Sequence, residues 1–280
     1  MKSKRGYLYK DFKLFHLKDN KKESFELHYH EFNKIIVFLS GKVNYLIEGK
    51  SYNLKPGDIL FINNYEVHRP IIDSSEEYER IIFWVNSDFL IKNNSNDFNL
   101  LKCFEFAAKN KINLLRLEND DKKYINELIR ELELEVDSKV IGSSILSSAL
   151  FIKLMVNLNR FFLNYDLSKE KADISFNEII QNILFYINNN LKEDLSIDSI
   201  SNKFFISKYY LMHKFKNETG YTLHSYINQK RMILACEYIK QGKNIHDVSE
   251  MCGFNDYSTF IRVFKKFYKL SPKEYKKDKF

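Results

Sequence analysis

Short apolar runs separated by turn-forming residues fill the first third of the chain. The turn signals are Ser40-Gly41, Glu48-Gly49-Lys50 and Lys55-Pro56-Gly57-Asp58. Between them lie β-branched and aromatic runs, which predict strands over residues 35–39, 43–47, 59–62 and 81–85. Strands this short, at this spacing, predict a small antiparallel barrel.

The period of the apolar residues changes after residue 97. Steps of three and four residues predict helices over 100–109, 121–134 and 143–164. We expect the last two helices to pack two chains together, the alternative being that they only cover the barrel. A polar stretch follows, and helical periodicity then continues to the end of the chain. The predicted fold is α+β, with a barrel in 1–97, a helical dimerisation and connecting region in 98–165, a linker in 166–173 and a helical domain in 174–280.

The helical domain contains a sequence repeat with two copies. Ser-Ile-Asp-Ser-Ile-Ser begins at Ser196 and Asn-Ile-His-Asp-Val-Ser begins at Asn244. Each is followed by a turn and a second helix, expected over 208–219 and 257–268, at an offset of 48 residues before the turn and 49 after it. A helix, a tight turn and a second helix, repeated, is the form of a double helix-turn-helix DNA reader.

The two copies carry matching capping and core positions. Ser196 and Asn244 are expected to cap the first helices, with Asp198 and Asp247 in or near the first turns. The equivalent core pairs are Ile200 and Val248, Leu211 and Phe260, and Phe215 and Phe264, with Ser201 and Ser249 as small residues at the helix contact. Gly253 permits the turn in the second copy, whereas Phe205 holds that place in the first. A helix over 177–191 is expected to bury Ile179, Ile180, Ile183, Leu184 and Ile187.

The second helix of each copy leaves a polar set outside its core positions, and we expect this set to contact DNA. Arg262 aligns with His213, and an arginine there can bridge O6 and N7 of guanine. A helix over 223–241, about 28 Å long at ~1.5 Å per residue, spaces the two readers for successive major grooves of double-stranded DNA. The expected DNA-contacting residues are Tyr209, Met212, His213, Lys216, Ser258, Thr259, Arg262, Lys265 and Lys266.

Charge supports the same assignment. The net charge is +7, and residues 171–280 hold 18 Lys and Arg against 12 Asp and Glu, a net of +6. The three cysteines match no metal or redox spacing and are expected to be buried, reduced thiols of a cytoplasmic protein. The start of the chain lacks the apolar core of a signal peptide, and the apolar stretch 147–163 is interrupted by polar residues, so no membrane span is expected.

The second copy of the repeat contains three distinctive segments: Gly253 to Phe260, Arg262 to Lys266, and Leu270-Ser-Pro-Lys-Glu-Tyr275. With these segments, the stretch 197–277 resembles the AraC/XylS family of bacterial transcription regulators. Two departures are Lys269, where the family usually has Gly, and Lys276, where it often has Arg. The family implies promoter binding, usually activation through RNA polymerase, under the control of an N-terminal sensor that holds a small effector, often a sugar. It also implies a homodimer.

The barrel histidines resemble the two cupin motifs, with His28-Tyr-His30 in the first and His68 in the second. Metal-binding cupins have Glu where this chain has Lys34, and an ammonium repels a divalent ion. We therefore expect no metal and no cofactor, the alternative being that the histidines are hydrogen-bonded remnants of the fold. The expected effector-binding residues are His28, His30, Lys34, Tyr45, His68 and Arg80, with Phe61, Arg69 and Trp84 as further candidates.

Three function classes compete. The first is a ligand-responsive transcription factor. The second is a metal-dependent cupin enzyme with an accessory DNA domain, against which Lys34 argues. The third is an architectural DNA-binding protein with a structural barrel, which a ligand-induced change in stability would separate from the first. The sequence shows no nucleophile–base constellation, phosphate loop or paired carboxylates, so no catalytic residue is expected.

Overall fold

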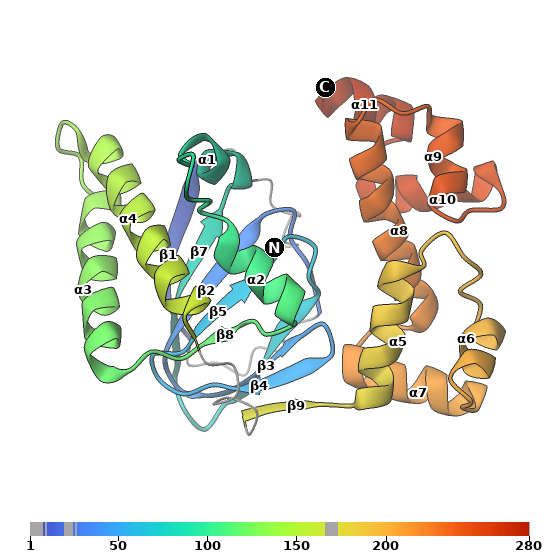
Figure 1. The fold of residues 1–280 in the computed structure, drawn as a ribbon, viewed down its shortest axis with the longest axis horizontal. Coiled ribbons are helices and arrows are strands. Elements are labelled where there is room, and N and C mark those ends of the chain that lie inside the picture. Colours follow the sequence, from blue (N-terminus) through green and yellow to red (C-terminus); the bar gives the residue numbers. More distant parts are fainter. Residues whose placement is uncertain (1–7, 9, 20–24, 26, 166–172, 280) are drawn as a thin grey trace. The chain divides into compact units, whose positions relative to one another are not determined.

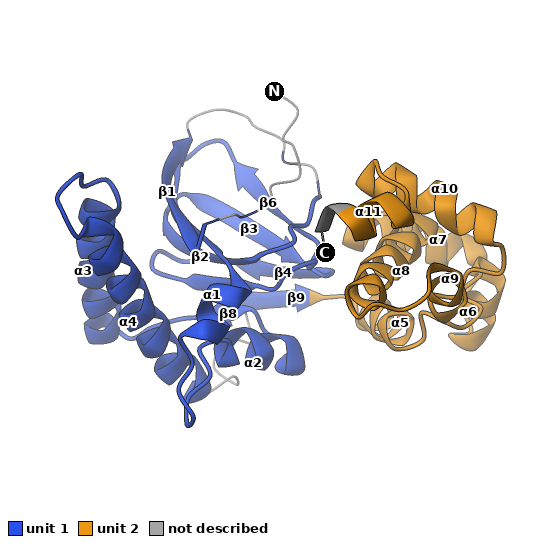
Figure 2. Cartoon of the chain, turned by 90° about the horizontal axis from the view of Figure 1, so that it is seen from above, with its two compact units in different colours: residues 1–175 blue, residues 176–280 orange. Residues whose placement is uncertain are grey.

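The computed structural model describes residues 8, 10–19, 25, 27–165 and 173–279. The chain forms two compact units, Met1–Ser175 and Phe176–Phe280 (Figure 2). Except for Asp173, the linker expected over 166–173 lies outside the described residues. The two units are described separately.

Unit 1 is built on two antiparallel sheets. The first has the order β1 (Phe12–Asp19), β7 (Tyr78–Val85), β2 (Asn33–Ser40), β5 (Ile59–Ile62), β8 (Leu114–Leu115). The second has the order β6 (His68–Asp73), β3 (Lys42–Ile47), β4 (Lys50–Asn53), β9 (Ile174–Phe176). All four strands expected from the sequence are present. The pattern missed β1, β4, β6, β8 and β9, none of which has more than two apolar residues in a row.

Strand alternation gives the first sheet two different faces. On β7, Ile81, Phe83 and Val85 pack beneath helices, whereas Tyr78 and Ile82 pack between the two sheets. The space between the sheets is the barrel interior. Helices cover the opposite face (Figure 1). They are α1 (Ser87–Lys92), α2 (Lys102–Asn110), α3 (Asn119–Val136) and α4 (Ser143–Leu163).

The helix α4 is long and apolar enough to cross a membrane by length and composition alone. Nine of its residues are buried in unit 1, so it is a core helix here. Its buried Asn159 accepts a hydrogen bond from the Cys103 backbone at 2.7 Å and donates to the Leu100 carbonyl at 2.9 Å. The polar residues that interrupt its apolar run therefore include one that fixes α4 to the start of α2.

Apart from Phe176, which ends β9, unit 2 is built from helices (Figure 1). Its helices are α5 (Glu178–Asn189), α6 (Ile197–Lys203), α7 (Lys208–Thr219), α8 (Leu223–Lys240), α9 (Ile245–Met251), α10 (Tyr257–Tyr268) and α11 (Pro272–Lys279). The expected core pairs are buried, and Ser201 and Ser249 are buried beside them. One expectation was wrong: Ile179 is 39% exposed, because the buried stripe of α5 runs through Ile180, Ile183, Leu184 and Ile187.

Candidate DNA-binding and barrel sites

Side-chain caps fix where the helices of each helix-turn-helix unit begin. In the first helices, the Ser196 hydroxyl accepts from Ser199 N at 3.1 Å, and the Asn244 side chain accepts from His246 N at 2.9 Å. The second helices α7 and α10 are capped by Ser207 and Asp256. These caps place both second helices over the residues that the sequence predicted.

The turn within each unit requires a left-handed backbone at one position. Gly253 has φ +79° in the second helix-turn-helix motif, and Phe205 has φ +54° at the matching place in the first motif. A Cβ on Gly253 would lie 2.4 Å from the Leu191 carbonyl oxygen, so a side chain there would clash as well as strain the backbone. The side chain of Phe205 is 95% exposed and gains no packing in return for its strain.

The polar faces of α7 and α10 carry the residues expected to contact DNA. Leu211 and Phe215 on α7 and Phe260 and Phe264 on α10 are buried. The expected contact residues Tyr209, Met212, His213, Lys216, Ser258, Arg262, Lys265 and Lys266 are exposed, and Thr259 is half-buried. Both helices therefore present the selected side chains away from the core of unit 2.

Within these exposed sets, His213 and Arg262 hold equivalent places, each two residues after the first buried aromatic or aliphatic position of its helix. The His213 ring stacks on Tyr209 with ring centroids 6.0 Å apart and lies 3.3 Å from the Asn217 amide nitrogen. These neighbours orient the imidazole along α7. A hydrogen-bonding side chain thus stands at the same outward position of both readers.

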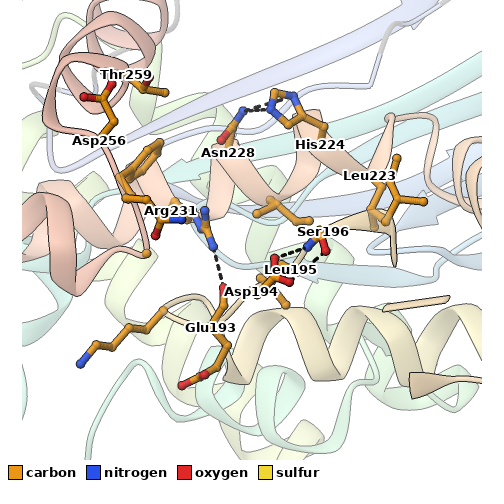
Figure 3. Close-up of a pocket in the computed structure, with 16 residues that line it drawn as sticks. Glu193, Asp194, Leu195, Ser196, Leu223, His224, Asn228, Arg231, Asp256 and Thr259 are labelled. Atoms are coloured by element: carbon orange, nitrogen blue, oxygen red, sulfur yellow. Dashed lines mark hydrogen bonds between the residues drawn. The ribbon is translucent and has the colours of Figure 1, made fainter. Parts of the chain in front are cut away.

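Within unit 2, helix α8 joins the two helix-turn-helix motifs and carries a residue that the sequence pattern did not single out. The Arg231 guanidinium donates to the carbonyl oxygen of Leu191 at 2.9 Å. A second hydrogen bond, to the carbonyl oxygen of Glu193, is also 2.9 Å long (Figure 3). The guanidinium also lies 5.5 Å from the ring centroid of Phe254, which is in the turn of the second helix-turn-helix motif. Arg231 therefore ties the loop before the first reader to the turn of the second, beside a pocket of about 500 Å³.

In the barrel, the three histidines named from the sequence converge. Their candidate ligand nitrogens all lie within 4.8 Å of one another. His28 pairs with His68 through two backbone hydrogen bonds, His28 N to His68 O at 3.2 Å and His68 N to His28 O at 2.9 Å. This pairing brings two segments 40 residues apart side by side and places both rings at one end of the barrel interior.

The hydrogen bonds of His68 define its tautomer. Its Nδ1 lies 2.8 Å from the carbonyl oxygen of Glu66 and donates to it, which leaves Nε2 as an acceptor. Nε2 lies 3.1 Å from Lys34 Nζ, which donates to it. Burial and then the charge of Lys34 hold the pKa of His68 well below its usual value, and the same causes lower the pKa of His30 to about 2. Both imidazoles are neutral at physiological pH.

Lys34 is itself buried, with 5% of its surface exposed. Burial, followed by the charge of Arg80, lowers the pKa of the Lys34 amine to about 7. Arg80 is also buried, but its guanidinium has an ion-pair partner in Asp19 and lies 4.2 Å over the Tyr78 ring. The barrel interior thus holds two cationic groups, only one of which is paired with a carboxylate among the described residues.

The structure brings the six expected effector-binding residues together. The Tyr45 ring stacks on His68 with centroids 6.2 Å apart, and Trp84 lies 5.9 Å from His30. Phe32, which stacks on His30 at 4.7 Å, was missed. Two further candidates point elsewhere: Phe61 packs on Phe162 of α4, and Arg69 follows His68 on β6 and so faces the other side of the strand.

The donor set fits a metal only in part. Three converging imidazoles suit a transition metal, and the Glu66 carbonyl is the kind of partner that orients a ligating histidine. Lys34, however, donates to the same Nε2 lone pair that would bind the ion. An ammonium there opposes a divalent cation, so the residues present do not fit a resident metal.

In the comparison with known proteins, two family models match separate parts of the chain. The family model described as AraC-like ligand binding domain matches residues 15–155, half of the chain, and the model described as Helix-turn-helix domain matches residues 200–278. The chain belongs to the AraC family. Like other AraC-family regulators of transcription, it joins a ligand-binding domain to a DNA-binding domain.

Curated AraC-family relatives match almost the whole chain. The HTH-type transcriptional activator RhaS of Mannheimia succiniciproducens is 25% identical over 260 residues, which cover 90% of this chain and 89% of that protein. The probable transcriptional regulator LumQ of Photobacterium leiognathi is 25% identical over 249 residues, covering 89% and 90%. The solved C-terminal domain of the response regulator yesN from Fusobacterium nucleatum is 33% identical, with a TM-score of 0.33, over 35% of this chain and 95% of that chain.

Proposed function

We propose that this AraC-family protein is a transcriptional activator that binds promoter DNA with both helix-turn-helix units and recruits RNA polymerase under the control of an effector in the barrel. The observation that carries the DNA part is the equivalent outward placement of His213 and Arg262 on two capped helices. The similarity to RhaS, a transcriptional activator matched over most of both chains, supports activation of transcription in preference to repression.

Fluorescence anisotropy with the full chain tests this proposal. The DNA is the intergenic duplex beside the gene, with a shuffled duplex as reference. Arg262→Ala should cost ~1–3 kcal/mol and relax the preference at one base pair, because it removes a bidentate contact. Arg130→Ala is the control, since Arg130 is an exposed arginine of α3 in unit 1. Equal affinity of the unchanged protein for both duplexes would refute sequence-specific binding.

The proposed regulator is a homodimer, joined through the end of the α3–α4 hairpin. Large apolar side chains are exposed there, and Ile141 is fully so. Burying such a patch against a second copy would remove it from water. The exposed residues are Leu134, Val136, Val140, Ile141, Ile145 and Leu146.

Light scattering after size exclusion tests the dimer. The unchanged chain should elute as a dimer and Ile145→Glu as a monomer, because a carboxylate in the centre of the patch would be desolvated. Ile91→Glu, an equally drastic change at an exposed isoleucine of α1, should leave the dimer intact. An unchanged chain that is monomeric at micromolar concentration would contradict this interface.

The proposed role of the barrel is effector binding in the cytoplasm and not catalysis. Lys34, bound to His68, occupies the place where a metal-dependent cupin needs a ligand. The effector is a small polar molecule, for which the family resemblance suggests a sugar. A stability increase of the full chain with a bound metabolite would separate this function from that of an architectural protein.

A further inference from the structure

The barrel site also indicates what kind of effector it takes. We propose that it binds an anion, a carboxylate or a phosphate group carried by a small metabolite, with Lys34 as the residue that pairs with the negative charge. This inference rests on the proposed effector-binding function and goes beyond it by naming the chemical class of the ligand.

Lys34 is a buried amine in the interior of the barrel. Lys34 extends from β2 into the barrel interior, where its amine donates to His68 Nε2 at 3.1 Å. Within the described parts of the chain it makes no ion pair with a carboxylate, whereas buried Arg80 pairs with Asp19. A buried cation is costly unless it is paired, so an anionic ligand would supply what the protein leaves out.

The other polar groups of the barrel interior do not balance the charge of this amine. Strand β7 contributes Arg80, whose charge repels that of Lys34, and β3 contributes Tyr45, whose ring stacks on His68. Arg80 in turn pairs with Asp19 of β1 and lies over the Tyr78 ring. The imidazoles of His28, His30 and His68 complete the surroundings, and those of His30 and His68 are neutral. A neutral imidazole such as that of His30 and the phenol of Tyr45 can donate hydrogen bonds to an anion without adding charge, whereas both ring nitrogens of His68 are already engaged. These neutral groups cannot offset the repulsion between the two cations.

The alternatives are a divalent metal and a neutral sugar. A metal adds positive charge beside Lys34 and must displace it from His68 Nε2. Sugar hydroxyls can bond to the imidazoles but leave the ammonium without an opposite charge. Trp84 and Phe32, which pack together beside His30, offer an apolar wall for the body of a ligand whose anionic end reaches Lys34.

A consequence is that binding takes up a proton. Because burial lowers the pKa of Lys34 to about 7, much of the amine is neutral above that pH, and a bound anion would raise the pKa again. The affinity for the anion should therefore fall roughly fifty-fold between pH 7 and pH 9, as the fraction of charged Lys34 falls.

The experiment measures the melting temperature of the full chain at pH 7 with sodium acetate or inorganic phosphate, against sodium chloride at equal ionic strength. At ten times the dissociation constant, a binding anion should raise the melting temperature by roughly 3 °C. A shift with acetate alone would indicate that the effector carries a carboxylate, and a shift with phosphate alone would indicate a phosphate ester. A shift with both would indicate that the site recognises the negative charge that the two anions share. Lys34→Met should abolish the shift, and Lys153→Met, an exposed lysine of α4, should keep it.

Two outcomes would overturn the proposal: no anion-specific shift in the unchanged chain, or an equal shift in Lys34→Met. A matched comparison keeps its failure distinct from that of the effector function. Glucuronate and glucose 6-phosphate carry an anionic group that glucose lacks. If all three shift the melting temperature equally, a neutral effector is bound, so the effector function stands and the anion proposal fails.

Discussion

Replacing Lys34 with methionine should stabilise unit 1 at neutral pH, and this gain should disappear at pH 10. The amine has a pKa of about 7 in the folded chain, against an ordinary value of 10.5 when unfolding exposes it. The unfolded state therefore binds the proton more tightly than the folded state. Below pH 7 the Lys34 amine is charged in both states, and the cost of burying that charge lowers the free energy of unfolding in full. Between pH 7 and pH 10.5 the folded amine is neutral, so the free energy of unfolding should rise as the unfolded amine loses its proton.

The magnitude follows from that shift. At ~1.36 kcal/mol per pKa unit, the proton linkage destabilises the fold by about 4 kcal/mol at pH 7 and by about 1 kcal/mol at pH 10. Methionine removes this linkage but leaves His68 Nε2 without its donor, which costs about 1–3 kcal/mol at either pH. The difference in unfolding free energy between variant and unchanged chain should thus fall by about 3 kcal/mol from pH 7 to pH 10.

Urea unfolding provides the assay. Trp84 is the single tryptophan of the chain and lies in unit 1, so its fluorescence follows the unfolding of this unit. The other titrating groups are common to both proteins and largely cancel from the difference. Lys153→Met is the control and should show no such pH dependence. If the Lys34→Met difference is the same at pH 7 and pH 10, Lys34 is not a buried amine with a lowered pKa.

Three further predictions concern unit 2. Phe205→Gly and Lys269→Gly should each stabilise unit 2 by about 0.5–1 kcal/mol in thermal unfolding, because both residues have positive φ, +54° and +63°; a loss of stability in both would show that their side chains are needed. Gly253→Ala should destabilise unit 2 by more than ~1 kcal/mol, since its Cβ meets the Leu191 carbonyl at 2.4 Å; an unchanged melting temperature would mean that the turn is free to move. Arg231→Ala should weaken binding to the two-groove operator more than to a half-operator that only one reader contacts; equal losses on both duplexes would make Arg231 an ordinary stabilising residue.

The helical repeat was predictable because its signals are local. The caps Ser207 and Asp256 and the buried pairs along α7 and α10 lie within a few residues of the boundaries that they set. Strand β6 gave no comparable signal, since His68, Arg69 and Pro70 open it and only its pairing with β3 makes it a strand. Lys269 has a left-handed backbone and stands where the AraC/XylS family usually has Gly. This departure from the family pattern therefore marks a position with positive φ.

Site geometry was predictable only as far as residue type. His28, His30 and His68 were named from their motifs, but their convergence depends on the His28–His68 bridge across 40 residues. The hydrogen bond from Lys34 to His68 depends in turn on how β2 and β6 face each other across the barrel interior. Arg231 carried no signal at all, because its partners are backbone carbonyls, which every residue has.

Hydroxyl-radical footprinting of the full chain on the intergenic duplex beside its gene tests most directly whether the two helix-turn-helix motifs read DNA together. The 18-residue helix α8, about 27 Å long at ~1.5 Å per residue, separates the two readers. Each bound chain should protect two patches about one helical turn apart on one face of the duplex, and Arg262→Ala should weaken the patch read by α10. A single protected patch per chain, or protection that is the same on a shuffled duplex, would contradict it.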